Sequence, residues 1–235
     1  MPPGTANITV VVRVRPLSQK EVMRGAFPTL EVHDGFKIDV TDPDDKMGGL
    51  DYLRLGQNKD RSYAFDHAME PGITQRSAFE KTTSELLPDV MHGRNACCFA
   101  YGATGSGKTF TMRGIEEAAS LLMPSSMPAQ PDALAGLLSV VEIAGARVFD
   151  LLHADKPEVR LQQDASGKCC MLGAVSEPLR CAADFLAVVE QAKARRATQS
   201  TGANSESSRS HAVIRLTVGP ATGSPHHGGG GGGGG

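Results

Sequence analysis

The residues best suited to chemistry lie in the stretch Gly102–Thr109, which reads GATGSGKT. Its spacing, Gly-x-x-x-x-Gly-Lys-Thr, is the pattern of a phosphate-binding loop. Glycines allow the backbone to wrap around phosphate groups with its amide N–H groups directed inward. The Lys108 ammonium would reach the terminal phosphates, and the Thr109 hydroxyl would bind Mg²⁺. The stretch therefore predicts a site for a nucleoside triphosphate and Mg²⁺, with contacts from Gly102, Thr104, Gly105, Ser106, Gly107, Lys108 and Thr109.

A second polar stretch, NSESSRSH, runs from Asn204 to His211. A polar surface loop is the simpler interpretation, because serine-rich loops are common. The arginine among the serines, followed by a histidine and a clean β-strand pattern, favours a functional loop instead. Hydroxyl groups in such a loop can hold Mg²⁺, a γ-phosphate and an attacking water, and they can move when the phosphate leaves.

A phosphate-binding loop needs a strand before it and a helix after it, and the flanking sequence predicts both. The apolar run 96–102, ACCFAYG, predicts a buried strand, and a helix is expected from Lys108 to Ala119. Period-two patterns predict further strands at 7–17, 62–69 and 137–152 and before Gly219, and a hairpin at 29–40 that turns at Asp34 and Gly35. The range 137–152 is expected to be one long strand that leads into a turn of helix.

Helical spacing of apolar residues predicts two further helices. One spans 74–93, with a break near Pro88 and Gly93. The other spans 184–196, and its apolar face is formed by Phe185, Val188, Val189 and Ala192. The alternation of strands and helices along the chain predicts an α/β layered fold.

Composition excludes several functional classes. The net charge of the 235 residues is −2, whereas a general nucleic-acid binder would be clearly basic. No apolar run approaches the roughly 20 residues that a membrane-spanning helix needs, and the N-terminus has no leader pattern. The five cysteines have no zinc-binding spacing, which favours free thiols in a reducing compartment. We therefore expect a soluble intracellular protein.

The two polar stretches together resemble those of a kinesin motor domain. Asn204-x-x-Ser-Ser-Arg-Ser-His matches all six fixed positions of the kinesin switch I signature. Residues 99–112 resemble the kinesin phosphate loop, with Ala103 where glutamine is frequent, and Arg13-Val14-Arg15-Pro16 resembles the first kinesin strand. The resemblance covers 7–218, with 1–6 as an N-terminal tail and 219–235 as a glycine-rich tail that cannot pack a core. Details of the motifs lean towards the microtubule-depolymerising branches.

The resemblance implies a P-loop NTPase fold, a central mixed sheet flanked by helices, that binds ATP with Mg²⁺. The adenine would lie against Arg13 and Pro16, and Phe110 would stack on it in place of the histidine that many kinesins have. The γ-phosphate would be sensed by Asn204, Ser207 and Ser208, and Ser208 would hold Mg²⁺ together with Thr109. Arg209 would form half of a salt bridge to a glutamate of the second switch. The implied partner is the microtubule, and the implied location is the cytoplasm and its cytoskeleton.

One departure from the family pattern limits these expectations. In kinesins the strand after switch I leads into Asp-Leu-Ala-Gly-Ser-Glu, whereas here Val218 is followed by GPATGSPHHGGGGGGGG. We therefore expect a motor domain that is incomplete at its C-terminus and lacks the second switch and the main microtubule-binding elements. One alternative is a kinesin-derived module that binds a nucleotide or a partner without cycling. A phosphotransferase for small molecules is disfavoured, because it would leave the switch I match unexplained.

Overall fold

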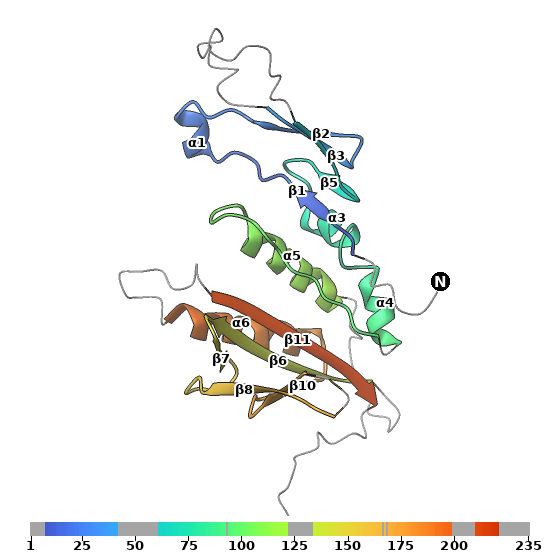
Figure 1. Ribbon diagram of the computed structural model, residues 1–235, viewed down its shortest axis with the longest axis vertical. Helices are drawn as coiled ribbons and strands as arrows, with labels where there is room; N and C mark the ends of the chain where they lie inside the picture. Colours follow the sequence, from blue (N-terminus) through green and yellow to red (C-terminus); the bar gives the residue numbers. More distant parts are fainter. Residues whose placement is uncertain are drawn as a thin grey trace, which may run out of the picture. The chain divides into compact units, whose positions relative to one another are not determined.

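The computed structural model describes residues 8–41, 61–92, 94–121, 134–165, 167, 169–198 and 210–220. The chain divides into two compact units (Figure 1). Unit 1 comprises residues 1–88 and 96–119, and unit 2 comprises 89–95 and 120–235. No helix within the described ranges is long and apolar enough to cross a membrane.

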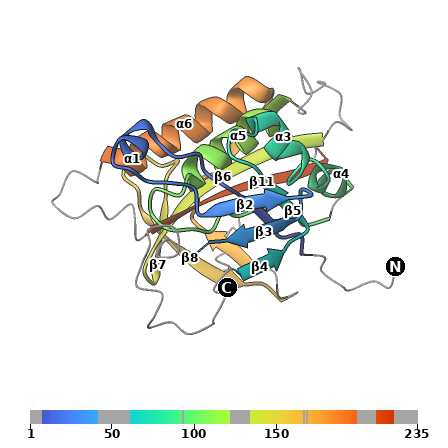
Figure 2. The same ribbon diagram turned by 90° about the horizontal axis from the view of Figure 1, so that it is seen from above.

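Unit 1 contains two small sheets. In one, β1 (Val11–Arg13) pairs in parallel with β5 (His67–Met69). In the other, β2 (Leu30–His33), β3 (Lys37–Val40) and β4 (Arg61–Ala64) form an antiparallel meander, in which β2 and β3 lie side by side (Figures 1 and 2). The two sheets share a small core of Val14, Ile38 and Ala68. The predicted hairpin is confirmed, and it turns where Asp34 and Gly35 adopt φ values of 54° and 74°.

Two helices of unit 1 begin at side-chain caps, and another begins at the glycine loop. Ser18 caps α1 (Gln19–Met23) in a reciprocal capping box with Glu21, and Thr74 caps α3 (Gln75–Glu80). α4 (Leu86–Met91) follows α3, and α5 (Lys108–Leu121) starts directly after the glycine loop. The predicted break near Pro88 is wrong. The chain leaves the helix at Lys81, and Pro88 lies in the first turn of α4, where a missing N–H costs no helical hydrogen bond.

Unit 2 is an antiparallel sheet with a helix on one face. β6 (Leu134–Ala144) and β11 (Ser210–Pro220) are its longest described strands, and they pair along their whole length, from Ser210 opposite Ala144 to Pro220 opposite Leu134. On the other edge of β6 lie β10 (Glu177–Leu179) and β7 (Arg147–Asp150). The order continues from β7 to β8 (Glu158–Gln163) and β9 (Cys169–Leu172).

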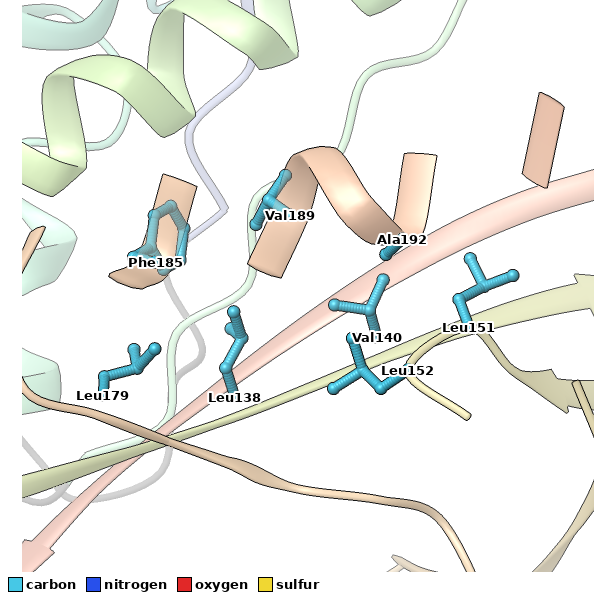
Figure 3. Close-up of a cluster of buried hydrophobic side chains, with 8 residues drawn as sticks. All are labelled: Leu138, Val140, Leu151, Leu152, Leu179, Phe185, Val189 and Ala192. Atoms are coloured by element: carbon cyan, nitrogen blue, oxygen red, sulfur yellow. The ribbon is translucent and has the colours of Figure 1, made fainter. Parts of the chain in front are cut away.

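The core of unit 2 lies between this sheet and α6 (Ala182–Thr198). Figure 3 shows Phe185, Val189 and Ala192 of α6 directed towards Leu138 and Val140 of β6. The other members of this buried cluster are Leu151, Leu152 and Leu179. The predicted apolar face of this helix is therefore confirmed. The single strand expected over 137–152 is wrong, because Gly145, with a φ of 62°, turns the chain back into the β6–β7 hairpin.

The buried strand predicted at 96–102 is also wrong. These residues belong to no strand, and Phe99 and Tyr101 are 80% and 96% exposed. The stretch is apolar enough for a central strand, but its composition alone cannot form one. A strand exists only where neighbouring strands accept and donate its ladder hydrogen bonds, and no described strand of this chain does so here.

We expect the amides of Ala96–Tyr101 to exchange with deuterium far faster than those of Leu138–Val141 in β6, which has ladder partners on both edges. An unpaired apolar stretch also invites pairing with other chains, so the 235-residue protein should aggregate at high concentration. Hydrogen exchange of the monomeric fraction measures this. Strong protection of Ala96–Tyr101 in a monomer would show that the stretch has found strand partners.

Candidate nucleotide-binding site

The glycine loop of unit 1 has a backbone that only glycine adopts easily. Gly102, Gly105 and Gly107 have φ values of 155°, 82° and 96°, in the region that side chains disfavour. A Cβ atom at position 102 would also lie 2.6 Å from the Ser106 Oγ atom. The loop therefore needs glycine at 102 for both its conformation and its close packing. A glycine-rich backbone of this kind can direct its amide N–H groups towards a phosphate.

The Lys108 side chain makes hydrogen bonds to the start of the glycine loop. Its Nζ atom donates hydrogen bonds to the carbonyl oxygens of Gly102 and Ala103, both at 2.8 Å. The ammonium is thereby placed over the loop from the first turn of α5. The N-terminus of this 14-residue helix adds unpaired N–H groups and the positive end of its dipole at the same place. The arrangement suits a polyanion.

A pocket of about 190 Å³ opens beside the loop. Its lining consists of Arg13, Val14, Arg15, Pro16, Gly72, Ile73, Ser106, Gly107, Phe110 and Thr111. All of these residues belong to unit 1. The pocket lies between the β1 segment and the start of α5. A ligand whose phosphates bind in the glycine loop could therefore place a flat, partly apolar group in this pocket.

Arg13 and Phe110 face each other in this pocket. The Arg13 guanidinium carbon lies 5.1 Å from the centre of the Phe110 ring, within the range of a cation–π contact. The guanidinium also donates to Gln75 Oε1 at 2.7 Å, Thr111 Oγ1 at 3.2 Å and the Ile73 carbonyl at 3.1 Å. Burial lowers the pKa of Arg13, but an arginine remains charged at any physiological pH. Phe110 is 60% exposed, which leaves much of its ring open to a ligand.

Arg15 is held at the pocket by Glu21. Its two terminal nitrogens lie 3.0 Å and 2.6 Å from the two carboxylate oxygens of Glu21. The side-chain hydrogen bond from Arg15, followed by those from Ser18, lowers the pKa of Glu21 to about 2. The pair therefore stays ionised throughout the physiological range.

The structure brings together part of the site predicted from sequence. Arg13, Pro16, Ser106, Gly107 and Phe110 line the pocket. The others in unit 1 form the loop and the first turn of α5 beside it: Gly102, Thr104, Gly105, Lys108 and Thr109. The predicted switch residues Asn204, Ser207, Ser208 and Arg209 lie outside the described residues.

Two residues on either side of the segment 199–209, Arg196 and Ser210, both contact Glu142 in unit 2. The Arg196 Nε atom, near the end of α6, lies 3.1 Å from Glu142 Oε1, and Ser210 Oγ at the start of β11 donates to the same oxygen at 2.5 Å. Lys156 Nζ lies 2.5 Å from the other oxygen. Burial alone would raise the pKa of Glu142, but the hydrogen bonds from Lys156, Ser210 and Arg196 hold that pKa below its ordinary value. Glu142 is thus an ionised, buried carboxylate that ties α6 to β11.

Sequence reasoning missed Gln75, Thr111 and Glu142. Gln75 and Thr111 occupied ordinary positions in predicted helices, and Glu142 was an unremarked member of a strand. One signal near Gln75 was available, because Gly114 stands inside a helix, where glycine is unfavourable by about 1 kcal/mol relative to alanine. Such a glycine often marks a close approach by another group.

Comparisons with known proteins identify the family of the chain. The kinesin motor domain family model matches residues 13–227. The rice kinesin-like protein KIN-13A is 33% identical over 220 residues, and the match covers 92% of this chain and 26% of that protein. Chicken KIF18B is also 33% identical, over 92% of this chain and 29% of its own length. The chain thus spans less than a third of the length of these relatives.

A solved structure gives the same result for the fold. It is described as "Structure of a fast kinesin: Implications for ATPase mechanism and interactions with microtubules", and it superposes with a TM-score of 0.73 at 23% identity. The match covers 90% of this chain and 59% of the kinesin chain. The predicted kinesin-like α/β fold is therefore confirmed. From the family model, which matches most of its residues, the chain belongs to the kinesin motor domain family.

Proposed function

We propose that this chain is the ATP-binding part of a microtubule-based motor, which couples ATP hydrolysis to movement on, or remodelling of, microtubules in the cytoplasm. The observation that carries the proposal is the glycine loop with Lys108 above it and the Arg13–Phe110 pocket beside it. Membership of the kinesin motor domain family supports the choice of ATP and of microtubules.

The residues present fit a Mg²⁺–ATP complex. The glycine backbone would donate amide N–H groups to the phosphates, and Lys108 would exchange its carbonyl contacts for phosphate oxygens. Thr109 and Ser208 would hold the Mg²⁺ ion, which supplies positive charge against the developing charge on the phosphates. Arg13, Pro16 and Phe110 would enclose the adenine. Asn204 and Ser207 would contact the γ-phosphate, and Arg209 would pair with a carboxylate when the switch closes.

We expect the 235-residue chain to bind ATP, to hydrolyse it slowly and to show no stimulation by microtubules. The physical reason is that Arg209 needs a glutamate of a second switch, and the Asp-x-x-Gly motif of that switch does not follow Val218 in this sequence. A steady-state ATPase assay with and without polymerised tubulin measures this. A several-fold rise in turnover on adding microtubules would contradict the expectation. Absence of ATP binding would contradict the proposed function itself.

A further inference from the structure

The Gln75 side chain, from the first turn of α3, makes hydrogen bonds to two residues that line the pocket, Arg13 and Phe110. Its Oε1 atom accepts a hydrogen bond from Arg13 Nη1 at 2.7 Å. Its Nε2 atom donates to the carbonyl oxygen of Phe110 at 2.6 Å. The amide therefore bridges β1, which carries Arg13, and α5, which carries Phe110.

A neutral amide can make both bonds at once, because it carries a donor and an acceptor. A glutamate could accept from Arg13 but could not donate to the Phe110 carbonyl when ionised, and a lysine could donate but not accept. The two partners also fix the orientation of the amide, because its oxygen must face the guanidinium and its nitrogen the carbonyl. The backbone of Gln75 is fixed in turn, since Gln75 is the first residue of α3 after its cap, Thr74.

Gly114 makes room for this bridge. A Cβ atom at position 114 would lie 2.4 Å from Cδ, 2.6 Å from Oε1 and 2.8 Å from Cβ of Gln75. Any other residue at 114 would thus expel the amide from its place. The glycine is unfavourable within α5, and its presence is explained by the space that Gln75 occupies.

We propose that Gln75 is a positioning residue for the base of the nucleotide: it holds the Arg13 guanidinium against the Phe110 ring, so that the pocket wall on which a flat base would lie keeps its shape. The inference rests on the proposed function, which places the base in this pocket. Gln75 does not itself line the pocket, so it acts through Arg13 and Phe110 and needs no contact with the ligand. The phosphate cradle, which is built from the glycine loop and Lys108, does not depend on it.

The test compares two ligands that differ in the base. Binding of Mg²⁺–ATP and of Mg²⁺–tripolyphosphate, which has no base, is measured by calorimetry on the full chain and on Gln75→Leu. We expect ATP to bind the variant about tenfold more weakly, the scale of one lost hydrogen bond to a charged group, and tripolyphosphate to bind it within twofold of the original chain. The matched control is Gln19→Leu, which changes the corresponding first residue of α1, an exposed position in the same unit.

A second variant keeps the test decisive if Gln75→Leu does not fold. Gly114→Ala retains Gln75 but displaces its amide, so it should show the same selective loss of ATP affinity. Equal weakening of both ligands, or unchanged ATP binding in a folded variant, would overturn the positioning role. If the original chain binds tripolyphosphate and ATP equally, the base has no pocket here and the inference fails. If it binds neither ligand, the proposed function fails as well.

Discussion

Replacing Glu142 by glutamine should lower the free energy of unfolding by about 3–5 kcal/mol, the cost of breaking a buried ion pair by removing one partner. The Glu142 side chain is 8% exposed and that of Lys156 is 10% exposed, so water cannot take over the lost interaction. The loss would be a large part of the roughly 5–15 kcal/mol that stabilises a typical domain. Urea unfolding at pH 7 should show a clearly lower midpoint for the variant.

The control is Glu158→Gln on the nearby strand β8. Glu158 pairs with Arg147 at 2.8 Å, but the two side chains are 50% and 62% exposed. Exposed pairs contribute only about 0–1 kcal/mol, so this variant should unfold close to the original chain. If Glu142→Gln and Glu158→Gln unfolded at the same urea concentration, the Glu142 cluster would not stabilise unit 2 in the way its burial implies.

The Glu142 cluster, which is Glu142 with Lys156, Arg196 and Ser210, also makes the stability depend on pH in a definite direction. Because the folded-state pKa of Glu142 is lowered, its stabilisation is fully present above the ordinary glutamate pKa of about 4.3 and is lost as the pH falls through the lowered value. The difference in stability between the original chain and Glu142→Gln should therefore shrink below that pH and remain constant above it.

Lys108→Ala should weaken binding of Mg²⁺–ATP by about 10- to 150-fold, the equivalent of roughly 1.5–3 kcal/mol for a hydrogen bond to a charged group. Lys108 is the cation that the structure places over the glycine loop, 2.8 Å from two of its carbonyl oxygens. Its removal leaves the amide cradle without that charge. Titration of a fluorescent ATP analogue measures the change, and removal of Mg²⁺ by EDTA should abolish binding to the original chain.

Lys81→Ala is a suitable control, because Lys81 is an exposed lysine of the same unit at the end of α3. The same titration should return the original affinity for this variant. Circular dichroism of Lys108→Ala would show that the loss is not one of folding. Equal affinities for the original chain and Lys108→Ala would contradict the role of the loop lysine.

Local features of this fold could be predicted from the sequence. The hairpin at Asp34 and Gly35 follows from residues that tolerate a positive φ, and the apolar face of α6 follows from its period. The glycine loop was also predictable, because its spacing is set by the chemistry of phosphate binding. In each case the residues that determine the structure lie within a few positions of one another.

The features that could not be predicted depend on distant residues. The stretch 96–102 has the composition of a buried strand, but a strand requires partners that composition cannot supply. The Glu142 cluster joins residues up to 68 positions apart, and Gln75 meets Arg13 across 62 positions. No local pattern marks such pairs. The turn at Gly145 was different, since a glycine between alternating segments is a turn signal, and the expectation of one strand over 137–152 overlooked it.

The most direct test of nucleotide binding at the glycine loop is hydrogen exchange of the 235-residue chain with and without Mg²⁺–ATP. Amides that donate to phosphates exchange slowly, so ATP should protect the backbone of Gly102–Thr109, and EDTA should reverse that protection. The exposed surface strand β4 should be unaffected. If ATP left the exchange of Gly102–Thr109 unchanged, or protected other segments alone, the nucleotide site would not be the loop that the sequence and the structure indicate.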